Sequence, residues 1–120
     1  MAQAFQELTV WQRARELTVA IYGLTKTFPR DEIYGLTSQL RRASVSIASN
    51  IAEGRGRGTE GEFRQFLNIA QGSTYEVQTQ LLVAKQLKIG NDALIGKAEL
   101  LCIETSKMLG AFIRSLEAKS

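Results

Sequence analysis

Apolar residues recur every three to four positions along nearly the whole chain, and this spacing predicts α-helices. The predicted helices span about 9–28, 31–53, 60–88 and 92–117. Connections of at most about eight residues join them, which is typical of antiparallel neighbours in a helix bundle. We therefore expect one all-α domain over residues 1–120, folded as an antiparallel up-down-up-down four-helix bundle.

Capping residues and helix breakers set the predicted boundaries. They are Pro29 after the first helix, Asp31 as N-cap of the second, Thr59 with Glu62 as a capping box for the third, Gly90 as its C-cap, and Asn91 or Asp92 at the start of the fourth.

Each predicted helix carries one apolar stripe that we expect to face the core. The first two stripes are Val10, Ala14, Leu17, Ile21, Leu24 and Phe28, and Leu36, Leu40, Ala43, Ile47 and Ile51. The last two are Phe63, Leu67, Ala70, Val77, Leu81 and Ala84, and Leu94, Ala98, Leu101, Thr105, Met108 and Phe112.

A second stripe on the second and third helices is polar. It consists of Gln39, Arg42, Ser46, Asn50 and Glu53 on one helix, and Ser73, Glu76 and Gln80 on the other. We interpret it as structural pairing across the helix interface, for example between Arg42 and Glu76, which would fix helix register or subunit geometry. The same residues could instead hold a ligand, such as an anion at Arg42.

The back of the second helix is unusual for a solvated surface, because it carries small and apolar residues where Lys and Glu would be expected. Val45, Ala48 and Ala52 occupy this back. We therefore predict that these three residues contact a neighbouring subunit, which makes a homo-oligomer the first functional inference.

The segment 54–61 contains four glycines in eight residues, which predicts the end of the second helix and a mobile connection. Its arginines could contact phosphates of RNA or DNA without reading the base sequence. The expected nucleic-acid-binding residues are Arg41, Arg55, Arg57 and Arg64. The alternative is a solvated loop that arginine keeps soluble, and no aromatic residue alternates with the arginines to support base stacking.

The composition limits the kinds of functional site that the chain is expected to form. The chain has no histidine, one cysteine (Cys102) and no P-loop ending, which argues against an enzyme, a metal site or a cofactor. Cys102 is expected to be a free core thiol in a reducing compartment. The absence of a signal-like segment and of a long apolar run favours a cytoplasmic protein without membrane contact. The net charge of +3 is only mildly basic.

Several motifs together resemble the four-helix bundle family associated with intervening sequences of 23S ribosomal RNA. They are Val10-Trp-Gln12, Phe28-Pro29, Glu32-Ile-Tyr-Gly-Leu36, Gln39-Leu-Arg-Arg42, Ser46-Ile-Ala-Ser-Asn-Ile-Ala-Glu-Gly54, Glu62-Phe63, Phe66-Leu67, and Gly72-Ser73 with Glu76. The resemblance covers about residues 5–116. It implies a homopentamer shaped as a tapering barrel, and similarity to the accessory variability protein of diversity-generating retroelements, a relative that binds nucleic acid and partners a reverse transcriptase.

Two main functional hypotheses follow. The first is a non-enzymatic oligomer that binds the backbone of RNA or DNA through basic residues. The second is a structural or adaptor oligomer that binds a protein partner through its apolar faces. A third, small-ligand binding inside the bundle, would need a pocket near Arg42, Asn50 or Glu76.

Overall fold

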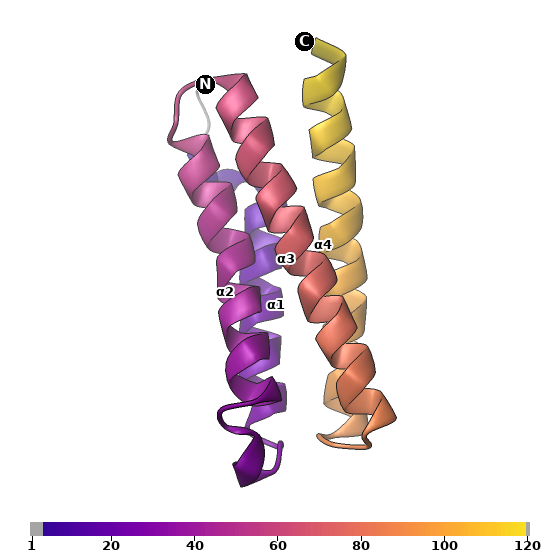
Figure 1. Ribbon diagram of the computed structural model, residues 1–120. Coiled ribbons are helices and arrows are strands. Elements are labelled where there is room, and N and C mark those ends of the chain that lie inside the picture. Colours follow the sequence, from indigo (N-terminus) through magenta and orange to yellow (C-terminus); the bar gives the residue numbers. More distant parts are fainter. Residues whose placement is uncertain (1–3, 120) are drawn as a thin grey trace.

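Residues 4–119, which the computed structural model describes, form four long α-helices and no strand. The helices are α1 (Thr9–Thr25), α2 (Leu36–Arg55), α3 (Glu60–Gln86) and α4 (Asp92–Lys119), with short 3-10 helices at Phe5–Glu7 and Arg30–Glu32. They lie side by side in a rod of 45 × 20 × 20 Å (Figure 1). Contacts join α1 to α2, α2 to α3, α3 to α4 and α4 to α1, so that the helices enclose one core.

The connections lie at both ends of the rod. Segments 26–35 and 87–91 are at one end and segment 56–59 is at the other (Figure 1). The first two segments touch, because the backbone N–H of Asn91 donates to the hydroxyl of Thr27 at 3.0 Å. The two ends of the rod differ in composition, because the glycine- and arginine-rich connection lies at the 56–59 end.

The buried side chains confirm the core stripes predicted for the first and third helices. Every residue of those two stripes is buried, including Leu17, Ile21 and Leu67 at 0% exposure. In α2 the predicted stripe is buried except Leu36, which is only partly covered.

The stripe predicted for the fourth helix is wrong by about one residue. The buried positions of α4 are Ile95, Ala98, Cys102, Thr105, Leu109, Ile113 and Leu116. The predicted Leu94, Leu101, Met108 and Phe112 are partly buried and pack against the edge of the core. Only Ala98 and Thr105 belong to both sets.

The predicted boundary between the first two helices also needs correction. α1 ends at Thr25, and the N–H groups of Thr27 and Phe28 then donate to the carbonyls three residues before them, ahead of Pro29. Asp31 does not cap α2, because it lies inside the 3-10 helix and α2 begins only at Leu36. The Glu32 carboxylate accepts from the backbone N–H of Leu36 at 3.1 Å and so performs the role that was expected of Asp31.

At the far end of α3 the C-cap is Leu87, and the left-handed residue directly after it is Lys88 and not Gly90. Lys88 has φ 59°, and the N–H groups of Lys88 and Ile89 bond to the carbonyls of Lys85 and Ala84 in the pattern of a Schellman motif. Gly90 has φ 84° and lies against Phe28 of the other connection. α4 then starts as predicted, since the Asn91 side chain accepts from the N–H of Leu94 at 3.0 Å.

The connection between α2 and α3 is shorter than predicted. Gly54 is a buried part of α2, which runs to Arg55, and only residues 56–59 lie outside helices. The Thr59 hydroxyl accepts from the N–H of Glu62 at 3.1 Å, which confirms Thr59 as the N-cap of α3 but shows only this half of the predicted capping box.

Candidate functional site

Polar side chains of α2 and α3 meet in cross-helix pairs along one face of the bundle. The Ser46 and Ser73 hydroxyls are 2.7 Å apart, and Arg42 Nη2 lies 2.7 Å from Glu76 Oε2. The Gln80 side-chain amide donates to Gln39 Oε1 at 3.3 Å. The contact expected between Arg42 and Glu76 is therefore present, and the pairs fix one antiparallel register for the two helices.

The charged pair of this polar stripe is exposed in the single chain. The side chains of Arg42 and Glu76 are 63% and 39% exposed, so water screens their attraction. Asn50 donates to Ser46 of its own helix at 2.8 Å, and Glu53 pairs with Arg57 at 3.2 Å. These last two residues of the stripe do not extend the pairing to α3.

Arginines gather at the end of the bundle where α2 leads into α3. Arg57 lies with its guanidinium carbon 4.9 Å from the centre of the Phe66 ring, and Arg55 lies 5.7 Å from that of Phe63. Arg64 follows Phe63 in the early turns of α3. Three of the four predicted nucleic-acid-binding arginines thus belong to one end of the molecule.

The aromatic partners of these arginines could not be predicted from segment 54–61 alone, because that segment contains no aromatic residue. Phe63 and Phe66 lie in α3 and reach the arginines through the helix pairing. The signal was available in the antiparallel register, which brings the end of α2 against the start of α3. Acidic residues share this end, namely Glu53, Glu60 and Glu62.

Arg41 is separated from the other three arginines. It is partly buried, donates through Nε to the Thr25 hydroxyl at 2.8 Å, and lies 4.6 Å over the Tyr22 ring. Fourteen residues of helix, about 21 Å at 1.5 Å per residue, separate it from Arg55. The structure therefore gives Arg41 a place in the α1–α2 contact.

The three residues predicted for the oligomer interface line one shallow groove between α1 and α2, of 290 Å³. The groove is lined by Val45, Ala48, Ser49 and Ala52 of α2 and by Trp11, Arg15, Thr18 and Val19 of α1. Val45 is 42% exposed and Val19 is 68% exposed. The single chain therefore leaves an apolar strip in contact with water at the expected position.

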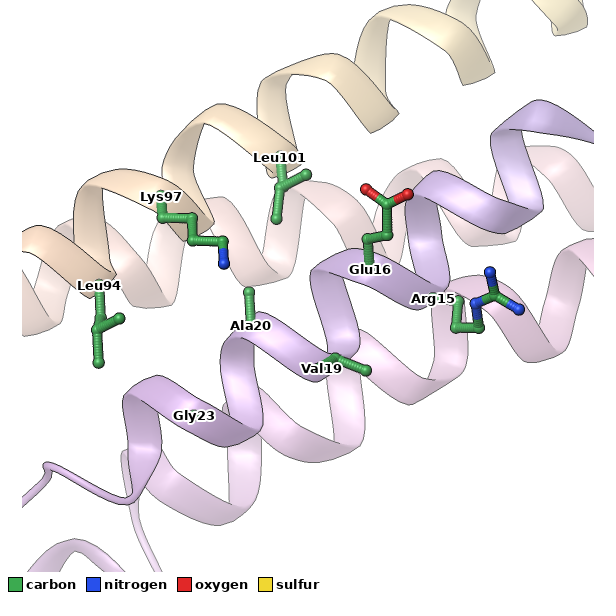
Figure 2. A pocket seen from close by; sticks show the side chains of 8 residues that line it. All are labelled: Arg15, Glu16, Val19, Ala20, Gly23, Leu94, Lys97 and Leu101. Atoms are coloured by element: carbon green, nitrogen blue, oxygen red, sulfur yellow. The ribbon is translucent and has the colours of Figure 1, made fainter.

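A second hollow, of 370 Å³, lies on the other side of α1, against α4 (Figure 2). It is lined by Arg15, Glu16, Val19, Ala20 and Gly23 of α1 and by Leu94, Lys97 and Leu101 of α4. Arg15 and Val19 border both hollows, so the outer face of α1 forms a ridge between them. The sequence did not predict this surface. The surface forms where residues at the edge of the α4 stripe lie beside the small residues of α1.

Cys102 is buried at the α3–α4 contact and has the properties of a core thiol. Its Sγ lies 3.4 Å from the carbonyl oxygen of Thr74, and its exposure is 0%. Burial, with a smaller contribution from the Glu99 charge, raises the pKa of the thiol from 9.0 to about 11. A nucleophilic cysteine requires the opposite shift. Among residues 4–119 no three His, Cys, Asp or Glu side chains group as metal ligands.

No helix within residues 4–119 combines the length and the apolar character that crossing a bilayer requires.

Comparisons with known proteins agree with this architecture. The family model described as 23S rRNA-intervening sequence protein matches residues 6–111. A crystal structure of a protein with unknown function from the S23 ribosomal protein family, from Bacteroides thetaiotaomicron, superposes with a TM-score of 0.79. The match has 23% sequence identity and covers 88% of this chain and 95% of the other, which shows a shared fold. No curated protein matches the chain.

Proposed function

The chain belongs to the 23S rRNA-intervening sequence protein family, and we propose that it is a non-enzymatic, oligomeric four-helix bundle that binds the backbone of RNA or DNA. The observation that carries the proposal is the gathering of three arginines at one end of the rod, where Arg55 lies over Phe63, Arg57 lies over Phe66, and Arg64 belongs to the early turns of α3. Arg41 is left out of the proposed surface because it is engaged with Thr25 and Tyr22.

Phosphate can compete for Arg57. The contact of Arg57 with Glu53 joins two half-exposed side chains, and such pairs contribute only about 0–1 kcal/mol. A guanidinium in contact with an aromatic ring through its carbon keeps N–H groups at its edge, and a phosphate can accept two of them. The nearby Glu60 and Glu62 repel phosphate, so we expect moderate affinity from each subunit.

The arginines would contact the backbone phosphates and would not read the base sequence. Three phosphates neutralised per site predict a log–log salt slope of about −2 for single strands and about −3 for duplexes. Between 50 and 200 mM salt this corresponds to a loss of about 20- to 40-fold in affinity.

Assembly would strengthen such binding. We propose an up-down-up-down bundle that forms a homopentamer, which is supported by connections at both ends of the rod and by the apolar strip at Val45, Ala48 and Ala52. Five chains of net charge +3 would carry +15 and would present several arginine clusters to one nucleic acid. We also propose that the protein is cytoplasmic and that it is related to the accessory variability protein of diversity-generating retroelements.

A mobility-shift titration with structured RNA, duplex DNA and single strands tests the proposal. We expect the variant with Arg55→Gln, Arg57→Gln and Arg64→Gln to lose most of its affinity and most of its salt slope. Arg30→Gln is the matched control, because Arg30 lies in the 3-10 helix at the opposite end. No binding at low salt, or equal losses in the two variants, would contradict the proposal.

A further inference from the structure

The net positive charge of the chain lies on two helix segments that pack against each other. Residues 64–75 of α3 and 105–116 of α4 contain three basic residues, Arg64, Lys107 and Arg114, and no Asp or Glu. Outside these two segments the chain has 12 basic and 12 acidic residues, out of 15 and 12 in all. The two segments therefore account for the whole formal charge of +3. We call the surface along which they meet the α3–α4 seam.

Contacts between the two segments show that they face each other. The Gln71 side-chain amide donates to the carbonyl oxygen of Ser106 at 3.0 Å. A Cβ added at Gly110 would lie 3.3 Å from Arg114 Nη1 and 3.8 Å from Gln71 Nε2. The guanidinium of Arg114 thus lies over the backbone of α4 at Gly110, on the side that faces α3.

The seam continues from the arginine end that is proposed for nucleic acid. Phe63 comes directly before segment 64–75, and its ring centre lies 5.2 Å from that of Phe112 on α4. Arg55 lies over the same Phe63 ring. Arg64 precedes Gln71 by seven residues, which is two turns or about 10.5 Å along α3, and so lies on the same α4-facing side. Arg64 therefore belongs to both surfaces.

The basic side chains on the α4 side of the seam are available to a ligand. Arg114 and Lys107 are exposed and make no hydrogen bond or ion pair within residues 4–119. They are seven residues apart, about 10.5 Å along one face of α4. Glu104 lies 3.4 Å from Arg13 of α1, which places it on the other side of α4. The next acid along α4 is Glu117, which lies beyond the segment.

An exposed aromatic residue lies on the α3 side of the seam. Tyr75 follows Gln71 by four residues, one turn farther from the arginine end, and is 54% exposed. Its hydroxyl makes no hydrogen bond within residues 4–119. Nucleic-acid bases stack on exposed aromatic rings. Only an unpaired strand can offer a base face to such a ring, because the bases of a duplex are stacked on one another.

We propose that the α3–α4 seam binds a single strand of nucleic acid, with backbone phosphates on its three basic residues and one base stacked on Tyr75. The inference rests on the proposed nucleic-acid binding, to which it adds a path along the rod and a preference for unpaired strands. The seam lies across the bundle from the α1–α2 groove, because α1 and α2 contact each other on the opposite side of the core. A bound strand and a subunit at that groove would not compete.

Two fluorescein-labelled probes separate phosphate contacts from base stacking. One is a single-stranded thymidine oligonucleotide, and the other is an oligonucleotide of the same length whose sugars carry no base. Fluorescence anisotropy with the full chain measures the affinity for each at several salt concentrations. We expect the wild type to bind the thymidine probe at least about fivefold more tightly than the abasic probe.

Substitutions at Tyr75 test the stacking. Tyr75→Ala should weaken the thymidine probe at least about fivefold and leave the abasic probe and the salt slope unchanged, whereas Tyr75→Phe should keep the wild-type affinity. Tyr34→Ala is the matched control, because Tyr34 is a 92% exposed tyrosine in the 26–35 connection at the opposite end of the rod. It should change neither affinity.

Substitutions of the α4 cations test the phosphate contacts. Arg114→Gln and Lys107→Gln should each weaken both probes and reduce the log–log salt slope by about 0.7. Lys97→Gln is the matched control, since Lys97 is an exposed lysine of α4 that borders the hollow against α1. Circular dichroism and light scattering check that each variant keeps the fold and the mass of the wild type.

The outcomes distinguish this inference from the proposed function. Equal affinity of the wild type for both probes, or equal losses in Tyr75→Ala and Tyr34→Ala, would overturn the stacking. A loss in Lys97→Gln as large as that in Lys107→Gln would overturn the path along the seam. If binding depends on Arg55 and Arg57 but on neither Tyr75 nor the α4 cations, the proposed function stands and this inference fails. No binding of any nucleic acid at low salt would overturn both, and a lower mass of Tyr75→Ala would show that the seam is a contact between copies.

Discussion

Gly54 of α2 and Phe66 of α3 meet so closely that a Cβ added to Gly54 would lie 2.5 Å from the Cβ of Phe66. The Cβ of Phe66 is bonded to the backbone, so no side-chain rotation can move it away. Gly54 is also the last residue of the Ser49-Asn-Ile-Ala-Glu-Gly54 run that carries the family resemblance. The glycine of that motif thus has a packing reason, which is the close approach of two helices beside the arginine end.

We expect Gly54→Ala to lower the free energy of unfolding by about 1–3 kcal/mol, because an extra carbon in a closed contact forces the helices apart. Urea denaturation measures the change. The control is Gly72→Ala in the middle of α3, where an added Cβ meets nothing within 4 Å. That substitution should raise the stability by about 0.5–1 kcal/mol through helix propensity alone. Equal effects of the two substitutions would contradict the packing argument.

The ion pair between Arg42 and Glu76 should contribute little to stability. We expect Arg42→Gln and Glu76→Gln each to cost less than about 1 kcal/mol, since both side chains are exposed by more than a third. A double-mutant cycle by urea denaturation, repeated at high salt, should give a coupling that shrinks with salt. A coupling of about 3 kcal/mol that ignores salt would show instead that the pair is shielded, as a subunit neighbour could achieve.

The sequence correctly predicted those features of the fold, such as helix caps, that a single short segment determines. Thr59 and Asn91 cap their helices by bonding to a residue three positions later, so the motif is complete within four residues. Lys88 escaped prediction because glycine, and not lysine, is the usual residue at a left-handed cap. The α4 stripe was misplaced because apolar residues stand in adjacent pairs, such as Leu94 with Ile95, and periodicity cannot choose between neighbours.

The contacts of the candidate site depend more on tertiary structure than the helix caps do, so fewer of them could be predicted from the sequence. The pairing of Arg42 with Glu76 could be predicted because both residues lie on stripes of antiparallel helices. The stacking of Arg57 on Phe66 could not be seen in the connection alone, since the ring comes from the next helix. Arg41 looked like a surface charge because its partner Thr25 is sixteen positions away in the chain.

The thiol of Cys102 should resist reagents in the folded protein. Burial holds its pKa at about 11, against 9.0 for an exposed thiol, so almost no thiolate exists at pH 8. We expect a disulfide reagent to label the native protein at least about 100-fold more slowly than the protein unfolded in urea. Rapid labelling of the native protein at pH 8 would show that the thiol is accessible and activated.

The same pKa difference should make stability depend on pH in the alkaline range. The folded state keeps the Cys102 proton while the unfolded state loses it above pH 9, so stability falls as the pH rises from about 9 to about 11. A two-unit difference corresponds to about 3 kcal/mol at most. Lysines and tyrosines also titrate there, so the measurement is the pH dependence of urea stability in the wild type minus that in Cys102→Ala. A difference of zero or of opposite sign would contradict the assignment.

The apolar strip at Val45 should control self-association. We expect light scattering to give about five times the 13.3 kDa subunit mass, and Val45→Asp to lower it toward the monomer, because an unpaired carboxylate buried at a contact is costly. Val83→Asp is the matched control, since Val83 on α3 has the same 42% exposure but does not line the α1–α2 groove. If the wild type is a monomer, or if both variants dissociate alike, the groove does not form the subunit contact, and its small residues then serve only the packing of α1 on α2.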